Sequence, residues 1–191
     1  SDLSETLSIK SYDDSNATYV TLLNTLKIKK VDYDRRDKGL SGAKFEVLTF
    51  NTPKTMAQYN ADNDNFGLDE ISNVHYTVFD ENTYTYSERV LNEIEVDPRG
   101  IIELNLPPGF YFIRETETPT GYDGDCQLYY LIYFNDRGTA QLMNTYDITE
   151  DNVLEEFSSG ALLVDDTDGV QGLISVRNRA NTFGMAEFTK T

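Results

Sequence analysis

Hydrophobic and polar residues alternate along most of this chain, in short runs that turn residues interrupt. A period of two is typical of β-strands, whose side chains point alternately to opposite faces of a sheet. The runs are rich in Tyr, Phe, Thr, Val and Ile, which favour pleated, half-buried surfaces. The pattern therefore predicts strands over residues 7–10, 17–23, 25–31, 43–50, 74–79, 101–106, 110–114, 128–134, 139–143, 161–164 and 173–177.

Turn residues between these runs indicate how the strands connect. Asn-Asp-Arg-Gly at residues 135–138 separates two predicted strands and is typical of a hairpin. A second cluster of Asp and Gly, at residues 165–169, is expected to connect another pair of strands. Many short strands joined in this way indicate an all-β sandwich with one or two short helices.

Helical patterns are few. Thr149 could cap a short helix that carries Val153, Leu154 and Phe157 and ends near Gly160. We therefore expect one helix in this part of the chain.

Two parts of the chain differ from the alternating pattern. Residues 51–70 are polar and rich in Asn and Asp, which predicts a functional loop or an inserted segment between two strands. We expect one domain over residues 25–180, with an insertion at about 51–96. Residues 1–24 are then extra strands or the tail of a preceding domain, and residues 181–191 are a linker and the start of a following one.

Charge excludes several classes of partner. The chain has 191 residues, with 16 Lys and Arg against 33 Asp and Glu, so its formal net charge is −17. Such a surface repels nucleic-acid phosphates and anionic lipid headgroups, so we expect neither nucleic acid nor a membrane as a partner. The longest apolar run, residues 129–134, is far shorter than the roughly 20 residues that cross a bilayer.

A metal site is not expected. Asp62, Asp64 and Gly67 have a superficial likeness to a calcium-binding loop. However, Phe66 occupies a position that needs an oxygen ligand, and Asn73 stands where such a loop has a bidentate Glu. A solvated loop is the better interpretation of this segment.

The remaining reactive residue types give no sign of an enzyme. The single His, His75, lies in an alternating run without a partner His, which favours a structural or exposed histidine. The single Cys, Cys126, follows a turn, has no nucleophile motif and cannot form an internal disulfide. One Cys and one His cannot make a structural zinc site. We therefore expect neither a cofactor nor turnover catalysis.

A twelve-residue motif carries the most specific signal. Residues 111–122 read YFIRETETPTGY. This segment resembles the E-box of Gram-positive pilins and adhesins, Y-x-L-x-E-T-x-A-P-x-G-Y, with Ile113 in place of Leu and Thr118 in place of Ala. Residues 26–32 (LKIKKVD) and 40–47 (LSGAKFEV) resemble the opening of the same family, and residues 173–178 (LISVRN) resemble its closing strand. The chain thus resembles the CnaB-type domain, also called the prealbumin-like or SpaA-type pilin domain.

This resemblance implies a spontaneous isopeptide bond between a Lys and an Asn, promoted by a buried acid. By position in the motifs, the Lys is Lys30, the acid is Glu115 and the Asn is Asn178. Strand alternation independently places these three residues on the inward faces of their strands, each after two apolar residues. Alternation alone would also fit an ordinary ion pair between Lys30 and Glu115, or two strand ends that reach solvent.

The chemistry expected from such a site follows from desolvation. An apolar environment favours the neutral amine of Lys30 and the neutral acid of Glu115. The amine can then attack the side-chain carbonyl carbon of Asn178, while Glu115 hydrogen-bonds the carbonyl and relays protons to the departing ammonia. The reaction occurs once per molecule, so it is autocatalysis rather than turnover.

The two ends of the chain carry fainter copies of the motifs. Residues 19–25 (YVTLLNT) are similar to a closing strand, with Asn24 in the position of its Asn. Residues 188–191 (FTKT) are similar to an opening strand, with Lys190 as its Lys. Asn24 and Lys190 are therefore candidates for cross-links of neighbouring domains. The simpler alternative is that both ends are extra edge strands of a single domain.

These motifs lead to two expectations about function. The first is a structural stalk or pilin module of a Gram-positive bacterium, extracellular and associated with the cell wall, whose partners are neighbouring domains or pilin subunits. The second is an adhesin module that binds a host matrix protein or glycan through residues 51–86, with Tyr59, Tyr76, Tyr84 and Tyr86. The pilin pattern ending in Tyr-Pro-Lys is absent, and Thr52-Pro53-Lys54 is only faintly similar to it.

Overall fold

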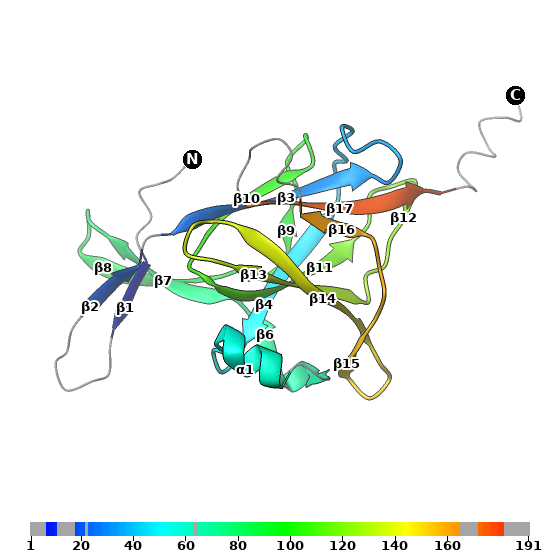
Figure 1. The fold of residues 1–191 in the computed structure, drawn as a ribbon. Helices are drawn as coiled ribbons and strands as arrows, with labels where there is room; N and C mark the ends of the chain where they lie inside the picture. The colour runs from blue at the N-terminus through cyan, green and yellow to red at the C-terminus, as the bar shows by residue number, and fades with distance from the viewer. Residues whose placement is uncertain (1–6, 11–17, 22, 63–64, 165–171, 182–191) are drawn as a thin grey trace, which may run out of the picture.

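A computed structural model describes residues 7–10, 18–21, 23–62, 65–164 and 172–181 of the chain. Two sheets pack face to face, and a third, smaller sheet lies at the amino-terminal end of the sandwich (Figure 1). The prediction of an all-β sandwich is confirmed.

The first sheet contains the opening and closing strands of the domain. Its strand order is β10-β3-β17-β12, and β16 also pairs with β17. The opening strand β3 and the closing strand β17 run parallel to each other, so both point toward the same end of the sandwich. The bounds are β3 (Asn24–Asp32), β10 (Ile101–Leu106), β12 (Tyr122–Asp123), β16 (Leu162–Val164) and β17 (Leu173–Ala180).

The second sheet contains the E-box strand β11 near its centre. Its order is β5-β15-β14-β13-β11-β4-β6, and β9 pairs with β4. The bounds are β4 (Lys44–Phe50), β5 (Phe66–Gly67), β6 (Ile71–Asn73), β9 (Ile94–Glu95), β11 (Gly109–Glu117), β13 (Leu128–Phe134), β14 (Ala140–Ile148) and β15 (Val153–Glu156).

The third sheet joins the amino-terminal residues to the insertion. Its order is β2-β1-β7-β8, with β1 (Leu7–Lys10), β2 (Thr18–Thr21), β7 (His75–Asp80) and β8 (Thr85–Val90). Strand β1 pairs with β2 on one side and with β7 on the other, with Leu7 opposite Val78. Residues 18–21, which belong to the segment that the sequence likened to a closing strand, thus lie at the edge of this sheet, and β1 separates them from β7 of the insertion.

The main hydrophobic core fills the space between the two large sheets. Alternate residues of β3, β4, β10, β11, β13 and β17 point inward, as the period of two predicts. The most completely buried of these side chains include Leu26, Ile28, Phe45, Val47, Ile113, Ile132, Phe134 and Ile174. This core holds the inward faces of β3, β11 and β17 at fixed positions relative to one another.

A second hydrophobic core covers the outer face of the second sheet. The inserted residues form helix α1 (Met56–Ala61) and the 3-10 helix η1 (Leu68–Glu70), and α1 lies against this face in Figure 1. Thr55 and Gln58 form a capping box at the start of α1, which explains why a helix begins in a polar segment. The described part of residues 51–70 therefore forms an inserted segment with two short helices of its own.

Aromatic side chains hold the insertion to the sheet. Phe66 lies 5.0 Å from Phe50 and 5.6 Å from Tyr146, measured between ring centroids in edge-to-face arrangements. The hydroxyl groups of Tyr59 and Tyr146 are 3.2 Å apart, at hydrogen-bonding distance in the buried region. The insertion thus belongs to the folded core of the domain.

The helix expected after Thr149 does not form. Instead, β14 and β15 make a hairpin in which the Thr149 amide donates to the Val153 carbonyl, 2.8 Å away. Asn152 adopts a left-handed backbone conformation with φ of 58°, which closes the turn. Leu154 is fully buried and lies in the strand that pairs with β14 and β5. The backbone pairing of β15 with β14 and β5, together with the burial of Leu154, outweighs the local preference of this segment for a helix.

We predict that the insertion contributes to stability through Phe66. Phe66→Ala removes a ring that is 2% exposed, so it should lower the free energy of unfolding by about 3–5 kcal/mol. Phe157→Ala is the matched control, because Phe157 is 45% exposed and its loss should change stability by less than about 0.5 kcal/mol. Chemical denaturation of both variants measures the difference. Equal midpoints would show that the second core contributes nothing.

Candidate cross-linking site

Three polar side chains lie buried together at one end of the main core. Lys30 of β3 is 0% exposed, Glu115 of β11 is 2% exposed and Asn178 of β17 is 6% exposed. These are the three residues that the E-box resemblance and strand alternation select. Buried charged groups are rare in proteins unless they are paired, because loss of hydration costs several kcal/mol.

The strand register explains how residues far apart in the sequence meet. In the parallel pair, Val176 lies opposite Lys30 and Asn178 lies opposite Asp32, so Asn178 is two residues further along than Lys30 on the same face. The long Lys30 side chain can span this offset. Glu115 comes from the facing sheet, at a bulge where the pairing of β11 with β4 shifts register. Bulges often redirect side chains in this way.

The carboxylate of Glu115 contacts both of the other groups. Its Oε2 is 2.5 Å from Nζ of Lys30, and this ion pair is fully buried. Its Oε1 accepts a hydrogen bond of 2.9 Å from Nδ2 of Asn178. The sequence led us to expect a contact with the carbonyl oxygen of Asn178, whereas the structure places the amide nitrogen against Glu115.

Burial dominates the electrostatics of this site. Desolvation lowers the pKa of Lys30 from its ordinary value, and attraction to Glu115 opposes this effect without reversing it. Burial also raises the pKa of the nearby Tyr130. The amine of Lys30 is therefore closer to its neutral, nucleophilic form than an exposed lysine would be.

Two further residues complete the surroundings of Glu115. Thr118 donates a hydrogen bond of 2.9 Å from Oγ1 to Oε1 of Glu115, and Oγ1 is also 3.6 Å from Sγ of Cys126. Gly124 passes so close that a Cβ there would lie 2.5 Å from Oε1 of Glu115 and 2.9 Å from Nδ2 of Asn178. Only a residue without a side chain fits in this place.

Sequence reasoning missed the role of Gly124. The residue lies between Asp123 and Asp125, where a glycine is ordinary turn chemistry, so no local signal identified it. The sequence identified Thr118 only as a residue that replaces the Ala of the E-box. Cys126 is a partly buried free thiol, as expected.

A cavity of about 290 Å³ opens beside Asn178. Tyr33 forms part of its wall, held by the guanidinium groups of Arg177 and Arg179, which lie 3.9 and 3.6 Å from the centre of its ring. Asp123, Asp125, Tyr130 and Ser159 also line the cavity. Asn178 thus borders the cavity, whereas Lys30 is fully buried.

Of the two residues proposed for neighbouring domains, the structure describes only Asn24, which lies away from this site. Asn24 is the first residue of β3, six positions before Lys30, and its Nδ2 donates to the carbonyl oxygen of Asp136 at 3.1 Å. Lys190 lies outside the described residues. Their part in cross-links remains a prediction from the sequence.

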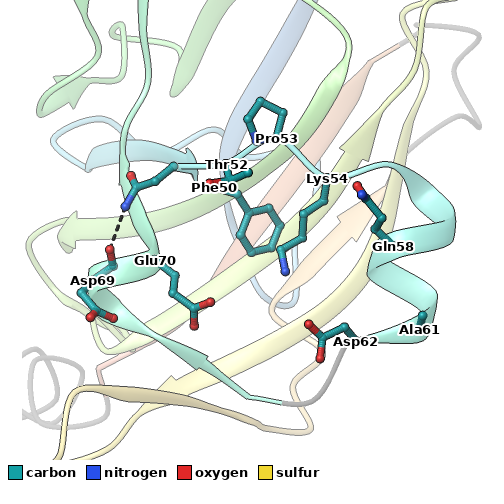
Figure 2. A pocket seen from close by; sticks show the side chains of 10 residues that line it. Phe50, Thr52, Pro53, Lys54, Gln58, Ala61, Asp62, Asp69 and Glu70 are labelled. Atoms are coloured by element: carbon teal, nitrogen blue, oxygen red, sulfur yellow. Dashed lines mark hydrogen bonds between the residues drawn. The ribbon is translucent and has the colours of Figure 1, made fainter.

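The insertion carries a larger cavity, of about 590 Å³ (Figure 2). Lys54 extends into it, with Nζ 5.0 Å from the ring centre of Phe50 and 5.2 Å from that of Phe66. In Figure 2 this ammonium points toward the side of the cavity where Asp62 and Glu70 lie. The cavity is thus polar and charged at its mouth and aromatic at its base.

The tyrosines proposed as a recognition surface differ in exposure. Tyr59 is buried in the second core, whereas Tyr84 is 81% exposed and Tyr86 is 46% exposed. The side chain of Tyr76 lies outside the described part of the structure. His75 is exposed and its Nδ1 lies 3.1 Å from Oε1 of Glu88.

No metal-binding group is found in the described part of the chain. There, no cluster of three or more His, Cys, Asp or Glu side chains could hold an ion. Asp64 of the calcium-like segment lies outside the described residues. The helices described are also too short or too polar to cross a bilayer.

Comparison with known families identifies the domain. The sequence model of the SpaA family, described as a prealbumin-like fold domain, matches residues 24–147. This chain belongs to the SpaA prealbumin-like fold family. The matched region of this SpaA-type domain contains Lys30 and Glu115, and Asn178 follows it. A comparison with curated proteins found no match.

Several solved structures resemble the SpaA-type domain at low identity. The pilus 2b backbone protein of group B streptococcus is 18% identical, with a TM-score of 0.41, over 93% of this chain and 48% of that chain. The pilus adhesin RrgA of Streptococcus pneumoniae is 16% identical, with a TM-score of 0.39, over 86% and 17%. The major pilin subunit BcpA of Bacillus cereus is 15% identical, with a TM-score of 0.33, over 86% and 33%. The chain thus spans less than half the length of each.

We predict that Gly124 is needed for the packing of the site. Gly124→Ala should force Glu115 or Asn178 to move and lower the free energy of unfolding by about 1–3 kcal/mol, as overpacking does. Gly109→Ala is the matched control, because the nearest atom to a Cβ there is 3.7 Å away. Thermal melting of both variants tests this. Equal melting temperatures would show that the site tolerates the added methyl group.

Proposed function

We propose that this domain is a load-bearing module of a Gram-positive pilin or adhesin, closed by an isopeptide bond between Lys30 and Asn178 that Glu115 promotes. The observation that carries the proposal is the contact of one buried carboxylate with both reacting groups, 2.5 Å from the amine and 2.9 Å from the amide nitrogen. Membership of the SpaA family and the E-box motif support the same assignment.

The reaction begins with a proton transfer. Oε2 of Glu115 takes a proton from Nζ of Lys30, which leaves a neutral amine and a neutral acid in the core. In this desolvated site, burying the neutral pair costs less free energy than burying the ion pair. The lowered pKa of Lys30 favours this step.

Bond formation and loss of ammonia follow. Nζ of Lys30 attacks Cγ of Asn178 and loses a second proton, and Nδ2 gains one proton and leaves as ammonia. Glu115 can shuttle this proton, because its two oxygens face the attacking and the leaving nitrogen respectively. A Nζ–Cγ bond replaces the Cγ–Nδ2 bond, and Glu115 ends protonated. The products are neutral, so the reaction removes a buried pair of charges.

The fold supplies the remaining rate acceleration by position. Amides are weak electrophiles, and the two sheets hold amine and amide on adjacent strands of the same core, which raises their effective concentration. The cavity beside Asn178 offers the ammonia a way out. The domain modifies itself once and is not a turnover enzyme.

A bond at this place suits a module under tension. It would join β3 directly to β17, the opening and closing strands, which lie side by side and parallel. Force that enters before β3 and leaves after β17 would then pass through the covalent link. Most of the sandwich would carry little load, which is the property that a stalk requires.

The setting that fits this module is the surface of a Gram-positive cell. We propose that it is extracellular and wall-associated, and that its partners are neighbouring domains or other pilus subunits. Asn24 and Lys190 remain candidates for contacts with such neighbours, and the Asn24 amide lies against Asp136, away from the buried site.

An adhesin role is the second candidate. It is favoured by the exposed Tyr84 and Tyr86 and by the cavity around Lys54. A panel of host matrix proteins and glycans separates the two functions. Saturable binding that Tyr84→Ser with Tyr86→Ser abolishes would support the adhesin, and absence of binding would leave the stalk alone.

We predict that the folded domain is lighter than its sequence mass by one ammonia. Intact-protein mass spectrometry measures this loss, and peptide mapping should find the Lys30 and Asn178 peptides joined. Glu115→Gln should fold without losing ammonia, because an amide cannot relay protons. Lys29→Met is the matched control, since Lys29 points to the other face of β3 and should not affect the reaction. A folded parent with unchanged mass would refute the bond.

We also predict a large effect of the bond on stability. It closes nearly the whole domain into a covalent loop, which by the entropy estimate used for disulfides stabilises the fold by about 5 kcal/mol. Lys30→Met should therefore melt at a much lower temperature than the parent and should unravel when pulled by its ends. Lys29→Met should behave like the parent in both measurements. A parent molecule that lengthens under force by a full domain would contradict the load-bearing function.

A further inference from the structure

Thr118 makes a contact that the cross-linking chemistry described above does not use. Its hydroxyl donates to Oε1 of Glu115 at 2.9 Å, the same oxygen that accepts from Nδ2 of Asn178 at 2.9 Å. We propose that Thr118 is a positioning residue that holds the Glu115 carboxylate in the orientation that bond formation requires. This inference rests on the proposed isopeptide reaction.

The reaction needs the two carboxylate oxygens in fixed places. Oε2 must face the Lys30 amine and Oε1 must face the leaving nitrogen of Asn178. The terminal torsion of a Glu side chain is broad, so the carboxylate plane can rotate unless its contacts fix it. The ion pair and the amide hydrogen bond involve groups that move as the reaction proceeds. Thr118 supplies the one described contact on Glu115 that stays unchanged throughout.

The surroundings of Thr118 keep its hydroxyl in place. The residue follows the end of β11 and precedes Pro119, which restricts its backbone to extended conformations. Its branched side chain has few rotamers. Sγ of Cys126 lies 3.6 Å from Oγ1, and the backbone of Gly124 closes the other side of the hydroxyl. A rigid donor therefore points at Oε1.

The motif that this segment resembles has Ala where this chain has Thr118. The hydroxyl is thus an addition to a site whose three reacting groups are already present. We expect it to change the rate of bond formation and not the final extent. Loss of a hydrogen bond to a charged group should therefore slow bond formation by about tenfold.

The test compares Thr118→Val with Thr118→Ser. Valine keeps the branched shape and lacks the hydroxyl, whereas serine keeps the hydroxyl. Each full-length chain is made in a short cell-free synthesis pulse, quenched in acid at intervals and weighed by mass spectrometry. Thr118→Val should lose ammonia about tenfold more slowly than the parent, and Thr118→Ser should stay within about threefold of it.

A second measurement separates positioning from a merely structural role. After complete reaction, Thr118→Val and the parent should melt within a few degrees of each other, because the cross-link is the same. If the parent and Thr118→Val lose ammonia equally fast, this inference is overturned and the proposed function stands. The same holds if Thr118→Ser is as slow as Thr118→Val. A parent that never loses ammonia would overturn the proposed function and this inference with it.

Discussion

The candidate site depends on one buried contact, that of the Glu115 carboxylate with Lys30 and Asn178. Three polar groups that would each be costly alone in an apolar core are brought together from three strands. As an ion pair, the site is a weak source of stability, because desolvation offsets most of the attraction. Its value is chemical. The same desolvation that makes the pair costly lowers the pKa of Lys30, which favours the neutral amine.

The parallel pairing of β3 and β17 makes this contact possible. Most of the other neighbouring strands in the sandwich are antiparallel. Antiparallel pairing of consecutive strands does not require the first and last strands of the domain to be neighbours. Placing the opening strand beside the closing strand puts Lys30 and Asn178 on one face, within reach of each other. The facing sheet then needs to supply only one acid, which β11 does at its bulge.

Much of this could be predicted from the sequence, for identifiable reasons. Alternation located the strands of the main core and the inward faces of Lys30, Glu115 and Asn178, because a half-buried strand imposes a strict period of two. It failed where tertiary contacts decide the structure. The strand around Leu154 looked helical locally, and the residues around Phe66 looked like a solvated loop. Both form strands of the second sheet and contribute side chains to the second core. Gly124 could not be identified either, because its importance lies in a close approach of its backbone to the side chains of Glu115, Thr118 and Asn178.

The small sheet at the amino-terminal end has a consequence for how such a module would respond to stretching. Strands β1 and β2 form an antiparallel pair that precedes Lys30, so this pair lies outside the loop that the proposed bond would close, and β1 pairs with β7. The strand β7 lies inside that loop. A pull on the amino terminus would therefore peel this pair from β7 before it strained the covalent link. The module would yield by a short length of chain at low force and then become stiff, and the pair could dock again when the tension falls. A stalk built from such units would absorb small shocks without unfolding its domains.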